Sequence, residues 1–506
     1  MSLFQNRYSK EEISNQISQK QKAIPFTTEY SGIPKDYILL PSLLIVVFVL
    51  LPVWTIWFAP FVLGYLLYKG FKSMGKILFS SSEYRLEESA IGEFGSDLGL
   101  ASDIIPFESR KYDIVVFGVT GHSGSLLAEY LIERYVKNGN TLKIAVAGRS
   151  FPKVTNSLEK IAKNIDYPQA VQLPVIVADS KDQNSLYAMA RNTRVISTTV
   201  GPFLKYGEPV VRACARYGTS YNDITGENDF VQQMRAKYGS LARASGASIV
   251  STTGVDSIPS DIGVLNVVRK FKERFNKDPE RVDNLIESAL GGVAGGTIDT
   301  FLQYLDVGPP PKYTLTNREV KGVLSQDPFY GLGYNRLGKV WTFPYIMAPI
   351  NTKVVESTNI SLGHTPRLHY NEAMIVPSII ANILFSLTSV IFSSIVFFYP
   401  TRCLLFKAGI LPKPGVGPSR KFMARGFFSQ KLIASTTDGL KEEVKFRFVG
   451  DPGGMLTALL QAEVAVSLST RKTTVLTTGA GLTPGETLDS VAFTKTLNDT
   501  GLINFE

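Results

Sequence analysis

The chain has 506 residues, of which 44% are hydrophobic and 19% are charged, a composition typical of a folded protein with about two to four domains. Its net charge of +9 is spread along the sequence, and no basic run is interleaved with aromatic residues, so the sequence does not favour a nucleic-acid-binding protein. Two cysteines, Cys214 and Cys403, and three histidines exclude a disulfide framework, predict no metal site and indicate a reducing compartment.

The first part of the chain predicts a polar arm followed by a membrane segment. Residues 1–36 are polar and of mixed charge, as in a flexible arm. Residues 37–80 form the predicted membrane segment, because the stretch 37–68 carries no charged side chain and is long enough to cross a bilayer once. Pro52 and Pro60 interrupt it, so one tilted helix, a hairpin in one leaflet and two short helices all stay open. A buried helix of a soluble domain is the competing interpretation.

After a polar linker at 81–110, residues 111–275 predict a dinucleotide-binding α/β domain. An apolar run at 114–117 has the pattern of a strand that is buried on both faces, and a helical pattern follows a glycine-rich turn. Glycine lets the backbone approach a pyrophosphate, and the start of a helix favours its negative charge. The spacing is G-x-x-G-x-x-G rather than G-x-G-x-x-G. The cofactor-binding residues predicted in this turn are Gly118, Thr120, Gly121, His122, Ser123 and Gly124.

The second predicted strand, 142–147, ends close to Arg149 and Ser150. This position is about thirty residues beyond the first glycine, where such a fold meets the adenosine ribose, and an NAD site would usually place Asp or Glu there. A guanidinium and a hydroxyl suit a 2′-phosphate instead. The sequence therefore predicts NADP(H) in preference to NAD(H), with a solvated Arg at the end of a strand as the alternative.

Further strands alternate with helices, at 173–178, 195–200, 220–224 and 248–252, which predicts a doubly wound, mostly parallel, Rossmann-like sheet. Asp179, directly after strand 173–178, is expected near the adenine, or else at the start of the next helix. The end of strand 195–200 is expected to face the nicotinamide half of the cofactor. The cofactor-binding residues predicted at these two strand ends are Asp179, Thr199, Gly201 and Pro202.

Hydride transfer also needs a proton donor, and three side chains near the predicted nicotinamide end are candidates. They are Tyr206, Lys205 and Asp256. Each has a structural alternative: Tyr206 stacks within a loop, Lys205 is solvated, and Asp256 caps the helix that begins near Ile258.

Residues 276–370 predict a second, α+β domain that covers the cofactor, and 411–506 are expected to complete it. Between them, 371–410 contains the stretch 373–401, which carries no charge and could span a bilayer. A single crossing would separate the two parts of the second domain, so a re-entrant or leaflet-bound segment is predicted. Burial in a soluble core is the competing interpretation.

Eight segments carry a resemblance to a known family, in family order from about residue 111 to the C-terminus. They are FGVTGHSG (117–124), AGRS (147–150), VGPFLKYGEPVVRAC (200–214), YNDITGE (221–227), TTGVDSIPSDIG (252–263), GGVAGGT (291–297), LPKPGVGPS (411–419) and GDPGG (450–454). Together they resemble the saccharopine dehydrogenase-like oxidoreductases, a group that includes the bacterial trans-acting enoyl reductases. The resemblance implies a Rossmann domain, a saccharopine reductase-like α+β domain and a nicotinamide cofactor.

The resemblance has departures. Relatives often have Gly-Pro-Tyr where this chain has Gly201-Pro202-Phe203, which removes a hydroxyl near the expected nicotinamide. No site for the two carboxylates and the amine of saccharopine is recognisable. Animal members of the group are associated with membranes and lipid droplets, which agrees with the apolar segments.

The sequence as a whole predicts a membrane-attached NADP(H)-dependent oxidoreductase of lipid metabolism that reduces an enoyl or carbonyl group of a lipid-like substrate. The alternative is a catalytically silent nucleotide-binding scaffold of a lipid droplet or membrane complex. Membrane lipid is the expected partner, and a homodimer or a membrane protein complex stays open. The expected location is a membrane facing a reducing compartment, either lipid droplet and endoplasmic reticulum or mitochondrion.

Overall fold

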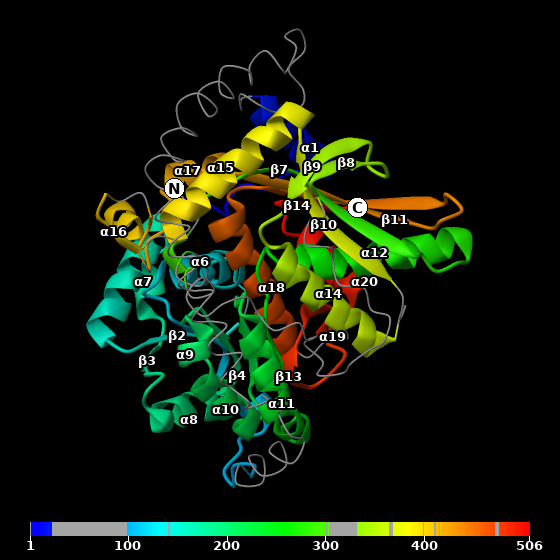
Figure 1. Cartoon of the computed structure of the whole chain (residues 1–506). Helices are drawn as coiled ribbons and strands as arrows, with labels where there is room; N and C mark the ends of the chain where they lie inside the picture. Colours follow the sequence, from blue (N-terminus) through cyan, green and yellow to red (C-terminus); the bar gives the residue numbers. More distant parts are fainter. Residues whose placement is uncertain are drawn as a thin grey trace, which may run out of the picture.

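In the part of the chain that the structure describes, two seven-stranded sheets lie one below the other in the view of Figure 1. The apolar stretch 37–68 lies outside the residues that the structure describes, so its predicted membrane role stays a prediction. The computed structural model describes residues 2–22, 99–292 and 331–506, except 140–141, 364–367, 398, 409–410, 414 and 471–474, together with single residues between 294 and 302.

The first sheet has the strand order β13-β6-β5-β4-β1-β2-β3, and its neighbouring strands are parallel. Within it, the order 3-2-1-4-5-6 is that of a Rossmann fold, as predicted. The strands are β1 (Tyr112–Phe117), β2 (Ile144–Gly148), β3 (Val175–Val177), β4 (Thr193–Thr198), β5 (Ser220–Asp223), β6 (Ser248–Val250) and β13 (Gly479–Leu482). The helices between them are α6 (His122–Leu131), α7 (Phe151–Ile165), α8 (Gln183–Arg191), α9 (Phe203–Tyr206), α10 (Glu208–Tyr217) and α11 (Asn228–Ser245).

The second sheet has the order β14-β12-β11-β7-β10-β9-β8 and is antiparallel except between β7 and β10. Helices α12, α14 and α20 lie on the side that faces the first sheet (Figure 1). The strands are β7 (Arg281–Leu290), β8 (Gly333–Asn335), β9 (Val340–Pro344), β10 (His369–Val376), β11 (Phe427–Ser435), β12 (Lys441–Val449) and β14 (Ile503–Phe505). The helices are α12 (Ile258–Phe275), α14 (Ala348–Leu362), α17 (Arg420–Arg425), α19 (Pro484–Thr487) and α20 (Ser490–Asn498).

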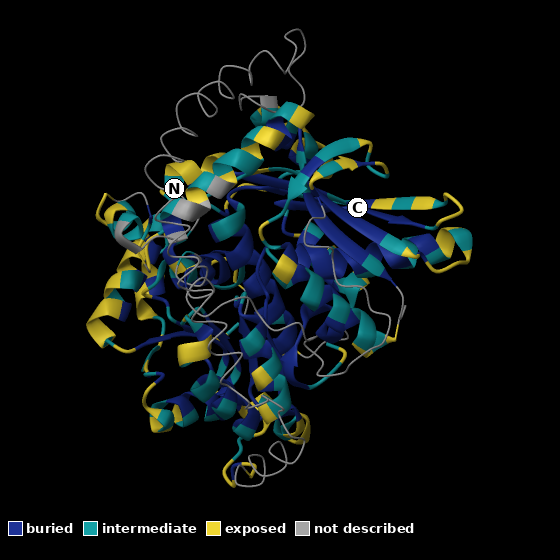
Figure 2. Ribbon diagram, viewed as in Figure 1, coloured by how far each residue is buried: buried dark blue, intermediate teal, exposed yellow. Residues whose placement is uncertain are grey.

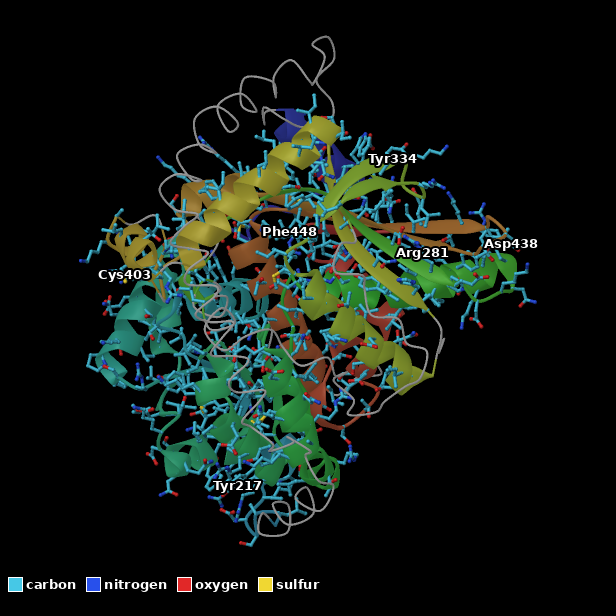
Figure 3. All side chains as sticks on the ribbon, viewed as in Figure 1. Tyr217, Arg281, Tyr334, Cys403, Asp438 and Phe448 are labelled. Atoms are coloured by element: carbon cyan, nitrogen blue, oxygen red, sulfur yellow. The ribbon has the colours of Figure 1, made fainter. Side chains whose placement is uncertain are left out.

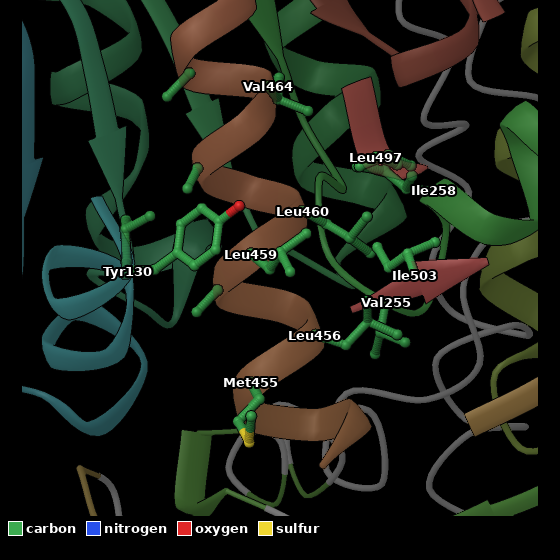
Figure 4. Packing of buried hydrophobic residues seen from close by; sticks show 14 of the residues in the cluster. Tyr130, Val255, Ile258, Met455, Leu456, Leu459, Leu460, Val464, Leu497 and Ile503 are labelled. Atoms are coloured by element: carbon green, nitrogen blue, oxygen red, sulfur yellow. The ribbon is translucent and has the colours of Figure 1, made fainter. Parts of the chain in front are cut away.

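Helix α18 (Thr457–Thr470) joins the cores of the two layers. Apolar side chains surround its axis, and nearly all of the helix is buried, as expected for a helix without a polar face (Figure 2). Figure 4 shows Tyr130 of α6 on one side of it and Val255 and Ile503 on the other. Residues 411–506, which the sequence analysis places in the second domain, thus contribute to both sheets, because α18 and β13 belong to the first.

The N-terminal arm is in part a packed helix, and the prediction of a flexible arm is wrong for it. Residues Lys10–Lys22 form α1, which packs on β11 and β12. Ile13 and Ile17, one helical turn apart, are buried against Phe427 and Val449. The sequence signal was weak because this pair of isoleucines stands within an otherwise polar helix.

The second apolar stretch, 373–401, begins in β10 and continues into α15 (Ile379–Phe397) and α16 (Tyr399–Lys407). Helix α15 packs on β9 and β10 through a small cluster that includes Ala381 and Val376. Among the residues that the structure describes, no helix is long and apolar enough to cross a membrane. Other apolar side chains of the two helices are exposed, namely Ile379, Ile383, Phe385, Phe392 and Leu404.

Candidate active site

The turn after β1 contains two positions at which a side chain would be strained or would clash. Gly118 has φ +101°, and a Cβ there would lie 2.9 Å from Thr199 Oγ1. A Cβ at Gly124 would lie 2.2 Å from the carbonyl oxygen of Gly118. Gly121 differs, because its Cβ would meet only that oxygen, at an ordinary 3.5 Å. The first and third glycines thus pack the start of α6 onto β1 and β4.

Helix α6 begins at His122, directly after this turn, and its N-terminus is not capped by a side chain. Gly121 is the N-cap residue, and its own N–H donates to the Gly118 carbonyl at 3.0 Å. The N–H groups of the first helical turn lack intrahelical partners and carry a partial positive charge. Thr120 is exposed and Ser123 is half-buried at the same place. This geometry fits a pyrophosphate.

His122, at the start of α6, contacts the segment 411–419, which joins α16 to α17 and is called the connector below. A Cβ at Gly417 would lie 2.3 Å from the His122 ring, so the connector rests directly on that ring. His122 Nε2 is buried and has no hydrogen-bond partner among the described residues. Burial lowers the pKa of His122, whereas the charge of Asp451 raises it. In the sequence, 411–419 stood out through the family resemblance, and the structure brings it to the predicted phosphate site.

The ends of β2 and β3 place the remaining adenosine-side candidates along the same edge. Arg149 is exposed after β2, and Ser150 occupies the N-cap position of α7 without a side-chain capping bond. Asp179 follows β3 and its Oδ1 accepts a hydrogen bond from Lys181 N at 3.0 Å. Asp182, not Asp179, caps α8. Neighbouring parallel strands end at one edge, so the predicted cofactor-binding side chains after β1, β2 and β3 are gathered there.

The loop 201–206 after β4 is fixed by a carboxylate that sequence reasoning missed. Glu227 is buried, and its two oxygens accept from the N–H groups of Phe203 at 2.9 Å and Leu204 at 2.7 Å. The carboxylate therefore holds the start of α9, which follows the Gly201-Pro202 cis peptide. The YNDITGE segment contained this residue, but nothing in its spacing indicated which loop it would bind.

Phe203, the departure from the Gly-Pro-Tyr pattern, is a buried residue. Its ring is 6% exposed and packs on Phe230 with 6.0 Å between the ring centroids. The following residues, Lys205 and Tyr206, interact with each other: the ammonium lies 5.2 Å from the ring centroid. Lys205 is exposed and Tyr206 is half-buried.

Asp223 organises the ends of β5 and β6 from a fully buried position. It accepts hydrogen bonds from Tyr221 Oη at 2.7 Å, Thr225 N at 3.0 Å, Thr252 N at 3.1 Å and Ser251 Oγ at 3.2 Å. Burial raises its pKa to about 6, although these hydrogen bonds favour the ionised form. Its partners lie on β5 and in the segments directly after β5 and β6, so it fixes the two strand ends against each other.

Asp256 follows β6 and does not cap α12. Ser257 occupies the N-cap position of that helix, and no side chain caps it, so the structural alternative for Asp256 is wrong. Asp256 is half-buried, and burial raises the pKa of its carboxyl to about 6.

Glu372 of β10 is fully buried opposite the start of α12. Its Oε1 accepts from Ser260 Oγ at 2.9 Å, Asn284 Nδ2 at 3.0 Å and Asn351 Nδ2 at 3.2 Å. Burial raises its pKa to about 8, and the nearby charge of Asp256 adds to the effect. A carboxyl bonded by neutral donors in such a place holds its proton near neutral pH.

Tyr345 is half-buried in the loop between β9 and α14. Burial raises the pKa of its phenol well above the ordinary value, and the charges of Asp256 and Glu372 raise it further. The start of α14 reaches the first sheet, because Ile350 Cδ1 would lie 3.2 Å from a Cβ at Gly226, just beyond β5. The second domain thus covers the end of β5. Sequence reasoning missed Tyr345 and Glu372; the only signal was an acid beside a long charge-free stretch.

The cysteines lie apart from this edge. Cys214 is buried in α10, and Cys403 lies in α16 at the margin of the molecule (Figure 3); neither forms a disulfide. Within the described ranges, no group of three or more His, Cys, Asp or Glu side chains could hold a metal ion.

Comparison with known proteins decides the family. No protein-family model matches the chain. A trans-acting enoyl reductase of Mycobacterium bovis is 32% identical over 386 residues, which are 71% of this chain and 89% of that protein. A trans-acting enoyl reductase of Mycobacterium leprae is 32% identical over 381 residues, with 70% and 88% covered. The chain belongs to this family of saccharopine dehydrogenase-like oxidoreductases.

Family membership makes the chain a nicotinamide-dependent oxidoreductase. A solved structure of saccharopine dehydrogenase (L-Glu forming) from Saccharomyces cerevisiae has a TM-score of 0.44 and 13% identity, and it covers 78% of this chain and 99% of its own. The glycine turn and the uncapped start of α6 fit the pyrophosphate of such a cofactor.

Proposed function

We propose that the chain is a membrane-attached NADPH-dependent reductase that reduces the enoyl group of a lipid-like acyl substrate. The observation that carries the proposal is the identity of 32%, over most of their length, to proteins named trans-acting enoyl reductases. The site adds support, because a Rossmann edge with a glycine turn lies next to a second domain, which contributes the buried carboxyl of Glu372 opposite the start of α12.

Each part of the site has a role in this reaction. The start of α6 binds the pyrophosphate, and Arg149 with Ser150 binds the 2′-phosphate. The loop 201–206, fixed by Glu227, lines the nicotinamide end. The cofactor supplies the hydride, and the chain supplies the orientation, the exclusion of water and the proton.

Turnover on a short trans-2-enoyl thioester with NADPH tests the reaction directly, by the loss of NADPH absorbance. We expect the rate constant kcat/KM to rise with acyl-chain length if the natural substrate is lipid-like, because each additional buried methylene contributes about 0.8 kcal/mol. Bound NADPH with no oxidation of the cofactor by any enoyl thioester would contradict the proposal and favour a silent scaffold.

The preference for NADPH rests on Arg149. A guanidinium paired with a phosphate contributes about 1.5–3 kcal/mol, which corresponds to roughly 10- to 100-fold in affinity. Arg149→Ala is therefore expected to weaken NADPH binding by this factor and to leave NADH binding nearly unchanged, measured by fluorescence titration. Lys441→Ala, which removes an exposed cation from β12, is the control. Equal loss of both cofactors in Arg149→Ala would refute the assignment.

Membrane attachment is supported by the charge-free stretch 37–68 and by exposed apolar side chains on α15 and α16. Exposed Lys407 follows them, as suits an anionic headgroup layer. Deletion of 37–68 is expected to release much of the chain from phosphatidylcholine–phosphatidylserine vesicles in a flotation assay. Adding Ile383→Glu and Phe392→Glu is expected to release the rest, whereas Val177→Glu on exposed β3 is the control. Full flotation of all these variants would refute attachment through these segments.

A further inference from the structure

The segment 223–227 carries two buried carboxylates that bind the backbone beyond both neighbouring strands. Asp223 ends β5, and Glu227 directly precedes α11. In the first sheet β5 lies between β4 and β6, and the three parallel strands end at one edge. Asp223 is 0% exposed and Glu227 is 1% exposed. The segment is therefore placed to hold the loop after β4 and the loop after β6 together.

Glu227 holds the loop after β4 with both of its oxygens. Oε1 accepts from Phe203 N at 2.9 Å, and Oε2 accepts from Leu204 N at 2.7 Å. Both N–H groups belong to the first turn of α9, where no intrahelical acceptor exists. A glutamine has only one acceptor oxygen, and its amide group would face the second N–H. The two bonds together therefore require a carboxylate.

Asp223 holds the loop after β6 with a single oxygen. Its Oδ1 accepts from Thr252 N at 3.1 Å and from Thr225 N at 3.0 Å. Thr252 has φ +60°, a left-handed conformation that is strained for a β-branched residue, so this contact stabilises a backbone that is unfavourable by itself. Oδ2 accepts from the hydroxyls of Tyr221, at 2.7 Å, and Ser251, at 3.2 Å. Hydroxyls also accept, so an asparagine can keep both backbone bonds.

The two loops flank the reacting end of the proposed site. The strand order 3-2-1-4-5-6 reverses between β1 and β4, and ligands of doubly wound sheets bind beyond the strand ends at such a reversal. The loop 201–206 borders this point, and the loop after β6 lies two strands further along. The second domain meets the segment between them, where Ile350 Cδ1 would lie 3.2 Å from a Cβ at Gly226. Segment 223–227 thus lies between the cofactor edge and the second domain.

We infer that Asp223 and Glu227 are positioning residues that fix the distance between the nicotinamide and the substrate double bond. The inference rests on the proposed reduction of an enoyl group. In that reaction, hydride from the nicotinamide forms a C–H bond at one alkene carbon as the π bond breaks, and the nicotinamide is oxidised. The other carbon takes up a proton, which comes ultimately from water.

Hydride transfer depends steeply on this distance. The reacting carbons must come within about 3–3.5 Å of each other, and a displacement of about 1 Å costs roughly 100-fold in rate. Loss of either carboxylate frees one of the two loops to move, so the rate constant of hydride transfer falls. NADPH affinity changes little, because the predicted pyrophosphate and 2′-phosphate contacts come from the ends of β1 and β2.

The experiment measures hydride transfer in a single turnover of the full chain. Protein with saturating NADPH is mixed with a trans-2-enoyl thioester, and the loss of NADPH absorbance gives the rate constant. Asp223→Ala and Glu227→Ala are expected to lower this rate constant by roughly 10- to 100-fold. Their dissociation constants for NADPH, from fluorescence titration, are expected to stay close to the wild-type value.

Conservative variants distinguish positioning from a general loss of structure. Asp223→Asn keeps the oxygen for both N–H groups and is expected to recover most of the rate that Asp223→Ala loses. Glu227→Gln keeps one bond of two and is expected to recover less. Asp113→Ala is the control, because Asp113 is a buried carboxylate at the opposite, amino end of β1 that accepts from Lys143 N at 2.7 Å. Its loss is expected to lower stability and to leave the hydride-transfer rate unchanged.

The outcomes are separable, with the unfolding midpoint as a check on folding. Slow hydride transfer with NADPH binding retained, recovered more by Asp223→Asn than by Glu227→Gln, and a normal rate in Asp113→Ala support the inference. Alanine variants that are less stable but equally fast overturn the inference alone, as does an equal rate loss in Asp113→Ala. If the alanine variants do not fold, a wild-type rate in Glu227→Gln overturns it. A wild type that binds NADPH but reduces no enoyl thioester overturns the proposed function and the inference together.

Discussion

Gly124→Ala tests whether the close contact between the start of α6 and the end of β1 requires glycine at this position. The added Cβ would lie 2.2 Å from Gly118 O and 2.7 Å from Thr199 Oγ1, both far inside contact distance. Because the first of these atoms is backbone, no side-chain rotation removes the clash. Overpacking of this kind costs about 3 kcal/mol at the upper end of its range, and Ala in place of Gly within a helix returns about 1 kcal/mol. The expected net loss in unfolding free energy is about 2 kcal/mol.

Gly239→Ala is the matched control. Gly239 is also a buried helical glycine, but its Cβ would meet only the end of the Arg243 side chain, at 3.6 Å. With no clash, helix propensity alone acts, and the variant is expected to be stabilised by about 0.5–1 kcal/mol. The two variants should therefore change stability in opposite directions.

Urea unfolding without cofactor gives both free energies, and NADPH titration then shows whether the displaced turn still binds. Gly124→Ala is expected to raise the dissociation constant for NADPH by about tenfold or more, since 1.4 kcal/mol corresponds to a factor of ten. If Gly124→Ala is as stable as Gly239→Ala and binds NADPH normally, α6 does not approach the end of β1 as closely as the structure shows.

Three further perturbations follow from single contacts. Glu227→Ala leaves the N–H groups of Phe203 and Leu204 without their acceptor. Calorimetry should therefore show a free energy of unfolding that is lower by about 1–3 kcal/mol, with a smaller decrease for Glu227→Gln. Arg420→Ala leaves the buried carboxylate of Glu129 without its ion pair of 2.7 Å, so the free energy of unfolding should fall by about 2 kcal/mol. Adding Glu129→Gln should restore part of this free energy, because it removes the buried charge. No recovery in the double variant would contradict a charge effect. Glu372 has a folded-state pKa of about 8 against an ordinary 4.5, so its protonated form stabilises the fold fully below pH 4.5, and this stability is lost as the pH rises towards 8. Glu372→Gln should therefore flatten the decline of the unfolding midpoint between these two pH values. An identical decline in wild type and Glu372→Gln would refute the raised pKa.

The sequence by itself determined six strands of the first sheet, and the seventh described strand, β13, comes from the C-terminal part of the chain. β1 and β2 are mostly apolar runs that are buried on both faces, and glycines mark the turn after β1, so the pattern of 111–275 predicted the parallel order of these six strands. The glycine turn is local in sequence, and its predicted residues occupy the end of β1 and the start of α6. Membership of the family was likewise readable from ordered short segments.

Only the tertiary structure decided the remainder of the site. Glu227, Glu372 and Tyr345 gave no local signal, because each acts on a group that is distant in sequence. Asp256 resembled a helix cap until the structure gave that position to Ser257. Side-chain direction and burial depend on how the second sheet packs over the first, and a one-dimensional pattern does not contain that packing.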